Sequence, residues 1–195
     1  MIDMKAEVCN MYIQRTKVYS LSAQMTAGFV FSCTLGFPLH FLYDWTQSRV
    51  VAAIAPVNES PFEHLKLVFF PLLLFLALQL IYTRRKRAPI PNLLWVYALS
   101  AALALSFVTV SYYTYSGIIG RHLMPVDIAI FVLALALAYY AAYRLIRSHP
   151  ARIKGFGLLG GAVLFMLALL LIVFTYLPPH LPWFCDPLTG SYGLA

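Results

Sequence analysis

Long apolar runs, separated by short polar stretches, dominate the sequence. Five runs have about the 20 residues that an α-helix needs to cross roughly 30 Å of hydrocarbon. They cover approximately 21–43, 65–83, 93–116, 126–143 and 156–177. Each run is too long and too apolar to be a strand, and a helix satisfies its own backbone hydrogen bonds in lipid. The pattern therefore predicts an all-α fold, a polytopic membrane bundle of about five transmembrane helices.

The composition agrees with a lipid environment. The chain of 195 residues is 62% hydrophobic and 11% charged, whereas a soluble domain carries roughly 25% charged residues. The first apolar run is too long for a signal peptide, and no small-residue cleavage site follows "HFLYDW". We interpret residues 1–195 as a single membrane domain with the lipid bilayer as its main partner.

The basic residues predict one orientation. If the five helices alternate in direction, segment 1–20, "RRKR" after the second run and the loop between the fourth and fifth runs share one side. These three segments hold 11 of the 14 lysines and arginines. The positive-inside rule then places the N-terminus in the cytoplasm and the C-terminus outside. This bias also explains the net charge of +7 without nucleic acid, so we expect no nucleic-acid partner.

Most acids and histidines gather on the predicted outer side. Five of the seven acids and four of the five histidines belong to this group: Asp44, Glu59, Glu63, Asp127, Asp186, His40, His64, His122 and His180. Ionisable groups at membrane depth often face an internal cavity and mark a site. The alternative is simpler, since acids are excluded from hydrocarbon and collect at helix ends in any case. The sequence leaves both interpretations open.

The candidate chemistry begins with a histidine and a carboxylate on one helix face. His40 and Asp44 are four residues apart, which suits a metal site, a proton relay or an oriented base. An interfacial helix end with a local hydrogen bond is the equal alternative. As a site, we expect His40, His64 and His180 to hold a divalent metal such as zinc. Glu59 or Asp44 would then act as the catalytic general base on water.

The stretch "NESPFEH" predicts the start of a helix. Ser60 fits the N-cap, Pro61 the first helical position and Glu63 the third, which together form a capping box. This leaves Asn58, Glu59 and His64 without a structural explanation, and we assign Asn58 and Glu63 to binding. The preceding segment is half apolar, so residues 44–64 are expected to form an outer interfacial or re-entrant loop with a short helix.

Three further features receive structural interpretations. The outer tail, 178–195, has turn signals at Asp186-Pro187 and is expected to pack Trp183 and Phe184 over the outer face. His122 and Asp127 are interpreted as capping and interface residues. Gly157 and Gly161, four residues apart, predict a close-packing surface on the last helix.

Three segments carry a resemblance to a known family. They are "LHFLYDW" (39–45), "APVNESPFEHLKLVFFP" (55–71) and, more weakly, "FCDPLTGSYG" (184–193). On these segments the chain resembles an uncharacterised family of small bacterial multi-pass integral membrane proteins, over nearly its whole length. The resemblance implies a location in the plasma (inner) membrane of a bacterium. It implies no activity and no site residues.

The sequence leaves three functions open. The first is an integral membrane protein with an outward-facing polar pocket that binds a small solute or a divalent metal, with a membrane-embedded metal-dependent hydrolase as its enzymatic form. The second is a transporter or channel component, which lacks the expected paired repeats of broken helices. The third is a structural or accessory subunit, and a homo-oligomer or a membrane partner fits all three.

Overall fold

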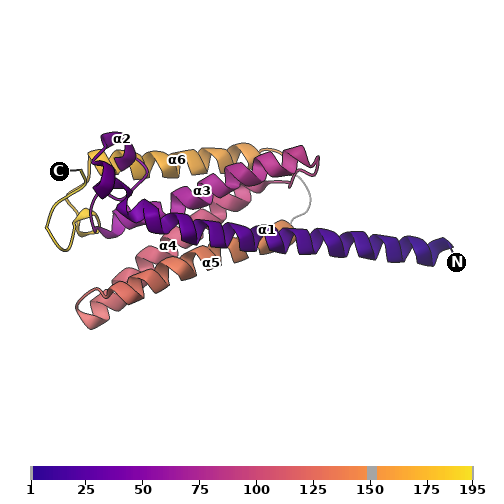
Figure 1. Ribbon diagram of the computed structural model, residues 1–195, viewed down its shortest axis with the longest axis horizontal. Helices are drawn as coiled ribbons and strands as arrows, with labels where there is room; N and C mark the ends of the chain where they lie inside the picture. The colour runs from indigo at the N-terminus through magenta and orange to yellow at the C-terminus, as the bar shows by residue number, and fades with distance from the viewer. Residues whose placement is uncertain (1, 149–152, 195) are drawn as a thin grey trace.

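The computed structural model describes residues 2–148 and 153–194, and these form a bundle of helices (Figure 1). The elements are α1 (Ile2–Thr46), α2 (Arg49–Ala52), α3 (Pro61–Arg85), α4 (Leu93–Ile119), α5 (Met124–Ser148), α6 (Phe156–Tyr176) and the 3₁₀ helix η1 (Pro182–Phe184). Over the described ranges there is no strand, only an isolated bridge between Cys185 and Tyr192. Of segment 1–20 only the helical backbone from Ile2 is described, and His149 and Arg152 lie outside the described residues.

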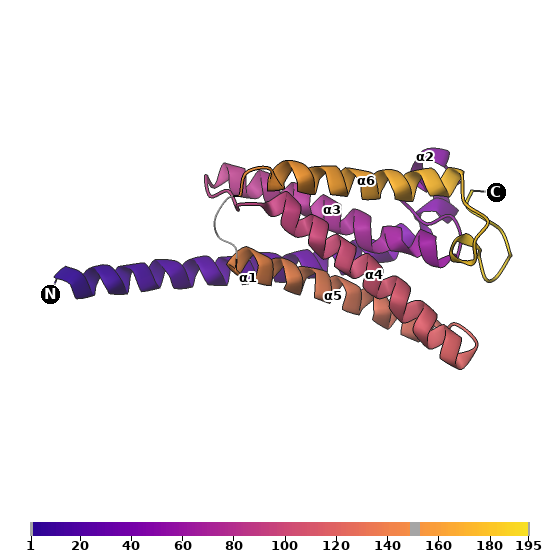
Figure 2. The same cartoon turned by 180° about the vertical axis from the view of Figure 1, so that it is seen from behind.

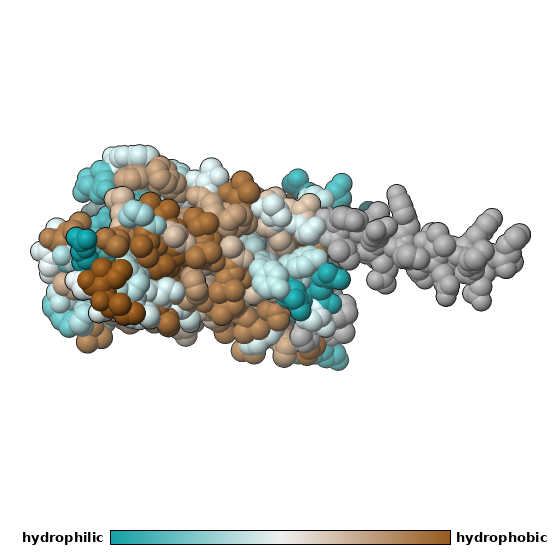
Figure 3. Space-filling model, turned by 90° about the horizontal axis from the view of Figure 1, so that it is seen from below, coloured by the Kyte–Doolittle hydropathy of each residue, from teal (hydrophilic) through white to brown (hydrophobic). Residues whose placement is uncertain are grey.

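Five helices are long and apolar enough to cross a membrane in the described part of the chain. They are Leu21–Thr46 within α1, then α3, α4, α5 and α6. The shortest has 21 residues, which at 1.5 Å per residue is about 32 Å. Figure 3 shows the matching surface, an apolar zone with hydrophilic residues at both ends. The prediction of a multi-pass all-α bundle is confirmed.

Most of the long helices extend beyond their apolar runs, and α3 and α5 show why. α3 begins at Pro61, ahead of the run, because Ser60 caps it and Pro61 needs no backbone donor there. α5 continues to Ser148, past the run that ends at 143. Its last turns are amphipathic, with Arg144 and Arg147 stacked on the tyrosines one turn earlier. Hydropathy identifies the apolar stretch of each helix, and both helices continue beyond that stretch.

α3 lies at the centre of the bundle. It contacts α1, α4, α5 and α6, and half of its most apolar window is buried. The core around α3 includes its own fully buried Phe69 and Leu72 and the fully buried Tyr97 of α4. The two opposite views in Figures 1 and 2 show α6 and α5 on different sides of α3 and α4. The start of α3 therefore sits among the ends of all its neighbours.

Close approach of α6 to α4 occurs at one glycine. A Cβ added to Gly160 would lie 2.3 Å from the backbone nitrogen of Trp95, whereas at Gly157 it would meet nothing within 4 Å. At Gly161 it would make only an ordinary contact, 3.6 Å from Leu94. The prediction that Gly157 and Gly161 form the packing surface was wrong, because α6 meets the backbone of α4 at Gly160.

Uncharged hydrogen bonds join three helices inside the bundle. The Tyr97 hydroxyl donates to Oε1 of Gln79 at 2.7 Å, and the Gln79 amide donates to Oε1 of Gln24 at 3.0 Å. Polar side chains inside a membrane bundle commonly pair across helices in this way. The network ties α4 to α3 and α3 to α1.

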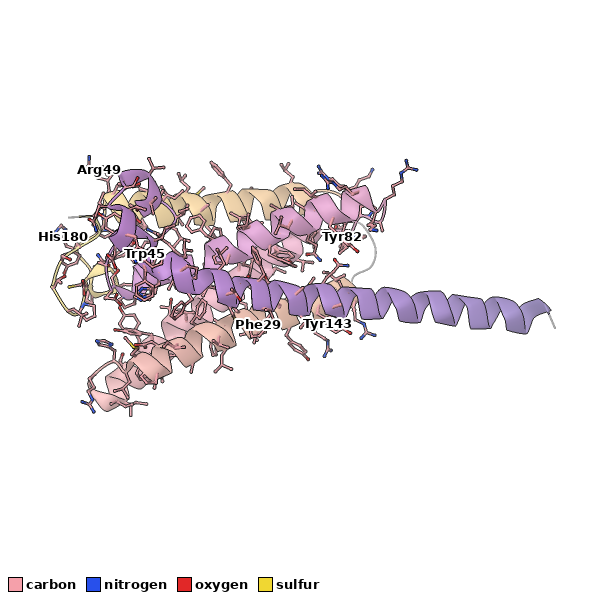
Figure 4. The ribbon with its side chains drawn as sticks, in the orientation of Figure 1. Phe29, Trp45, Arg49, Tyr82, Tyr143 and His180 are labelled. Carbon is pink, nitrogen blue, oxygen red and sulfur yellow. The ribbon has the colours of Figure 1, made fainter. Side chains whose placement is uncertain are left out.

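The bundle has two distinct ends, visible in Figure 4. Trp45, Arg49 and His180 lie at the end that carries α2, and Tyr82 and Tyr143 lie toward the opposite end. We call the first the α2 end: it holds the end of α1, α2, the start of α3, the α4–α5 turn and the tail. The second is the RRKR end, named for residues 84–87. Which end faces the cytoplasm stays a prediction.

Candidate metal centre and its pocket

Three parts of the chain deliver one polar cluster to the α2 end. His40 lies near the end of α1, Glu59 in the loop before α3, and His64 in the first turn of α3. The Ser60 hydroxyl accepts the Glu63 N–H at 3.3 Å, which fixes the start of α3 and with it the position of His64. The cluster thus depends on the packing of α1 against α3 and on the predicted N-cap, which is confirmed.

The three side chains converge on one another. Nε2 of His40 and Nε2 of His64 are 3.2 Å apart. Oε2 of Glu59 is 3.3 Å from Nε2 of His64, and its Oε1 is 3.8 Å from Nε2 of His40. One ligand atom from each residue therefore lies within 4.8 Å of the other two. This group was found among the described residues, and it contains two of the three predicted metal ligands.

The ring of His64 is oriented by the backbone. Its Nδ1 is 2.9 Å from the carbonyl oxygen of Ser60. A carbonyl only accepts, so Nδ1 carries a proton. In the metal-free protein Nε2 is protonated as well when it donates to Glu59, and release of that proton leaves a lone pair facing the cluster, as metal binding requires. Metal-binding histidines are commonly oriented by such a bond from the second ring nitrogen. His40 differs, because its Nδ1 is buried without a partner among the described residues.

Glu59 supplies the negative charge of the cluster. Its hydrogen bond with His64 lowers the pKa of the carboxyl below its ordinary value of 4.5, against the raising effect of burial. The charges of His64, His40 and His122 lower it further. Glu59 is therefore a carboxylate at neutral pH, the form that binds a metal.

A cavity of about 80 Å³ opens beside the cluster, between α3, α4 and α5. One water needs about 10–15 Å³ of such volume, so the cavity has room for about six. Glu59 and His64 form one part of its wall. The remaining wall is polar at Thr109, Tyr112, His122 and Asp127, and apolar at Pro61, Leu67, Val68, Val108, Ile130 and Phe131.

A second histidine–carboxylate pair belongs to the same cavity. Nδ1 of His122 is 3.5 Å from Oδ2 of Asp127. The Tyr115 hydroxyl donates to Oδ1 of Asp127 and accepts the N–H of Leu123 at 3.1 Å. The sequence interpretation of His122 and Asp127 as capping residues missed this placement. The available signal was their membership of the outer polar group, but nothing in the sequence brings the α4–α5 turn to Glu59.

Glu63, predicted to bind, is instead part of a buried ion pair. It is 1% exposed, and its Oε2 is 2.6 Å from Nζ of Lys66 and accepts the Val57 N–H. Nζ of Lys66 also donates to the carbonyl oxygens of Ala52 and Ala55 at 2.8 and 3.1 Å. The pair therefore holds α2 and the following turn onto α3. Because Glu63 faces Lys66, the return bond of the capping box is absent, and Ser60 N–H donates to Asn58.

Asn58, the other predicted binding residue, ties the tail to the loop. Its amide nitrogen donates to the carbonyl oxygen of Gly193 at 3.1 Å, and its Oδ1 accepts the Ser60 N–H at 3.0 Å. Neither Asn58 nor Glu63 lines the cavity. Both residues therefore hold neighbouring segments together: Asn58 joins the tail to the loop, and Glu63 pairs with Lys66.

His180 and Asp44 stand apart from the three-residue cluster. The ring of His180 packs on Tyr192, with centroids 4.8 Å apart. The tail is held there because Phe184 is buried against Phe62. Asp44 is exposed one turn beyond His40. The third member of the cluster is thus Glu59, to which the sequence analysis assigned the role of general base, and not His180.

Comparisons with known proteins place the chain in a family. A model described as "family of unknown function (DUF6512)" matches residues 13–194. No curated protein and no solved structure matches the chain. The expectation of an uncharacterised family is confirmed, and a bacterial origin stays a prediction. The chain, matched over nearly all of its length, belongs to the DUF6512 family of unknown function.

Proposed function

We propose that this multi-pass membrane protein binds one divalent transition metal, with zinc as the first candidate, through His40, Glu59 and His64. The observation that carries the proposal is the convergence of their ligand atoms. With Zn–N bonds of about 2.0–2.1 Å and tetrahedral angles, two ligating nitrogens lie about 3.3 Å apart. The two Nε2 atoms are 3.2 Å apart, which is the spacing that ligation of one zinc ion requires.

The donor set separates zinc from the common hard cations. Calcium and magnesium take six or more ligands, nearly all of them oxygen. Two imidazoles and one carboxylate suit zinc and its neighbours in the first transition row. A third histidine is not required, because two histidines and a glutamate are an established ligand set of catalytic zinc.

The geometry favours hydrolysis as the activity of the bound metal. Three protein ligands leave one coordination position open, which is the arrangement of catalytic rather than structural zinc. A zinc ion in such a position supplies Lewis-acid activation of water. The cavity begins at Glu59 and His64 and also holds His122 and Asp127. His122, oriented by Asp127, is the group placed to move a proton there.

The proposed orientation puts this pocket outside the cytoplasm. The α2 end carries the cluster, and the RRKR end carries Arg84, Arg85, Lys86, Arg87, Arg144, Arg147 and Lys154. By the positive-inside rule the RRKR end faces the cytoplasm, which in a bacterium makes the site periplasmic or extracellular.

Metal content tests the binding proposal directly. Purified protein, exchanged into zinc and then freed of excess ion, is analysed by inductively coupled plasma mass spectrometry. We expect one zinc per chain, and loss of that zinc in a His40→Ala, His64→Ala double variant. His180→Ala is the matched control, since it removes a histidine at the same end but outside the cluster. Wild-type protein without zinc, or equal loss in the control, would contradict the proposal.

Hydrolysis needs a separate test, for which a small chromogenic ester such as p-nitrophenyl butyrate is a suitable probe. The zinc-loaded protein should hydrolyse it faster than the His40→Ala, His64→Ala variant. His122→Ala should retain zinc and lose roughly 10²-fold in rate, the usual contribution of a positioned acid or base. Equal rates in the zinc-loaded and zinc-free proteins would exclude esterase activity while leaving the metal site standing.

A further inference from the structure

A second hollow lies between α1 and α5, away from the metal centre and toward the RRKR end. Its volume is about 300 Å³, and its walls come from Ser22, Met25, Thr26 and Phe29 of α1 and Ala136, Tyr139, Tyr140 and Tyr143 of α5. Figure 4 shows Phe29 and Tyr143 along the same edge of these two helices. The hollow is a groove, apolar and aromatic, at the depth where the membrane-spanning part of α5 ends.

The floor of the groove is fixed by packing. Tyr139 is 3% exposed, and its ring meets Phe75 with centroids 5.7 Å apart. A Cβ at Gly28 would lie 2.4 Å from the Tyr139 ring, so α1 approaches the ring as closely as glycine allows. The Tyr139 hydroxyl shares a hydrogen bond of 2.8 Å with Ser32. The groove is therefore formed in advance of any occupant.

Two arginines stand at the membrane-surface end of this groove. Arg144 stacks on Tyr140 and Arg147 on Tyr143, with centroid distances of 5.8 and 5.4 Å. In each pair a guanidinium Nη1 donates to the tyrosine hydroxyl at 2.9 Å. A guanidinium has five N–H donors, so the tyrosine bond orients each arginine and leaves donors for an anion.

None of the acids whose side chains the structure describes, in 21–148 and 153–194, lies beside this pair. Asp44, Glu59, Glu63, Asp127 and Asp186 all belong to the α2 end. Asp127 is on the same helix as Arg144 but 17 residues earlier in the sequence, which is about 25 Å along the axis. Arg144 and Arg147 are three residues apart and share one face of α5. The two oriented guanidinium groups therefore come from neighbouring positions on one face of α5.

We propose that the groove binds one anionic phospholipid, with its phosphate between Arg144 and Arg147 and an acyl chain against Phe29 and Tyr139. Arginine–phosphate pairs are strong, charge-assisted and often bidentate. Basic pockets between transmembrane helices bind anionic head groups in this way. The occupant follows from charge complementarity, since the groove offers apolar walls in the hydrocarbon and two cations at its edge. The inference is independent of the metal site.

A matched pair of variants separates a built site from general attraction to basic surfaces. Arg144→Gln with Arg147→Gln removes the cations at the groove. Arg84→Gln with Arg85→Gln removes the same charge from the end of α3, which does not line the groove. Ala136→Phe places a ring in the groove and leaves every charge in place.

The test counts bound lipids by native mass spectrometry. Purified protein in detergent is mixed with dioleoyl-phosphatidylglycerol or dioleoyl-phosphatidylcholine over a range of concentrations. We expect one phosphatidylglycerol to bind at least tenfold more tightly than phosphatidylcholine. The preference should disappear in the Arg144, Arg147 variant, binding should weaken at least tenfold in Ala136→Phe, and the Arg84, Arg85 control should behave as wild type.

Three results would overturn the proposal: equal binding of the two lipids by wild type, equal loss in the two arginine variants, or unchanged binding in Ala136→Phe. Circular dichroism of each variant identifies any that fails to fold. Should Ala136→Phe fail to fold, Thr26→Leu narrows the same groove from α1 and carries the same expectation.

Discussion

The most constrained side chain at the residue scale is Lys66. It is fully buried, and its ammonium group contacts the Glu63 carboxylate and two backbone carbonyl oxygens that end the α2 turn. Oε1 of Glu63 accepts in turn from the Thr175 hydroxyl of α6 at 2.8 Å. A buried pair of this kind adds little net stability, but removing one partner leaves an uncompensated charge.

Lys66→Met should therefore destabilise the protein by about 3–5 kcal/mol. The reason is that the Glu63 carboxylate and the carbonyl groups of Ala52 and Ala55 lose their cation. Adding Glu63→Gln to Lys66→Met should recover part of the loss, because the buried charge is then gone as well. Unfolding in detergent, followed by circular dichroism, measures both. An unchanged midpoint in Lys66→Met would contradict the buried pair.

Glu59 gives a pH-dependent prediction for the metal-free protein. Because its hydrogen bond with His64 lowers the pKa of the folded carboxyl below 4.5, Glu59 stabilises the folded state above the ordinary pKa. This contribution is lost as the pH falls through the lower folded value. Thermal melts of wild type and Glu59→Gln should thus differ most between the ordinary pKa values of glutamate and histidine, where Glu59 is ionised and His64 is protonated, and should converge in stronger acid. Melting curves that diverge further as the pH falls below the ordinary pKa of glutamate would have the wrong sign.

Sequence reasoning at this scale placed His40, Glu59 and His64 in one site, but it expected His180 as the third ligand and gave Glu59 the role of general base. A capping motif, readable from Ser60 and Pro61, fixed where α3 starts and left His64 unexplained. The third member of the cluster could be identified only from the tertiary structure. Histidine is a common zinc ligand, which favoured His180, but Glu59 is the residue that lies beside His40 and His64. The packing of Phe184 on Phe62, the Asn58–Gly193 bond and the bond from Leu194 N–H to the Thr175 carbonyl hold the tail in a position that leaves His180 outside the cluster.

Helix identity was predictable from sequence because lipid imposes a minimum apolar length, whereas contacts between helices were not. The sequence does not distinguish the three glycines of α6, Gly157, Gly160 and Gly161. In the structure a Cβ would meet backbone atoms of α4 at Gly160 but not at the other two. The relative rotation of two helices decides which glycine lies at their crossing, and near-uniform hydrophobicity around α6 does not report that rotation. For the same reason the outer polar group could be recognised in the sequence, but the cavity that the α4–α5 turn shares with Glu59 could not.

Gly160→Ala should weaken the α4–α6 contact. Its new Cβ would lie 2.3 Å from the Trp95 nitrogen, so the helices must separate, at a cost of about 1–3 kcal/mol. Gly157→Ala is the matched control, because a Cβ there meets nothing within 4 Å. Thermal unfolding in detergent compares the two, and equal midpoints would mean that α6 packs elsewhere.

At the scale of the whole molecule, the two ends have opposite chemistry. The α2 end gathers the acids whose side chains the structure describes and the candidate metal cluster, and the RRKR end gathers arginines, with the proposed lipid groove beside it. A site confined to one end fits binding and hydrolysis at a membrane surface. The transporter alternative requires a path between the ends, and the polar groups that α3 shares with α1 and α4 toward the RRKR end are hydrogen-bonded to one another.

Orientation can be measured by cysteine labelling in intact cells. In a background without the native cysteines, Arg85→Cys should react with a membrane-impermeant maleimide only after the membrane is opened. Leu188→Cys, on the exposed part of the tail, should react before. Labelling of residue 85 in intact cells would place the RRKR end outside and the metal cluster in the cytoplasm.

The metal centre itself is tested most directly by X-ray absorption spectroscopy of the zinc-loaded protein. The account predicts two imidazole nitrogens at about 2.0–2.1 Å, carboxylate oxygen at a similar distance and no sulfur. One imidazole should disappear from the spectrum of His64→Ala and none from that of His180→Ala. A zinc–sulfur distance of about 2.3 Å, or a shell of water oxygens without imidazole, would contradict it.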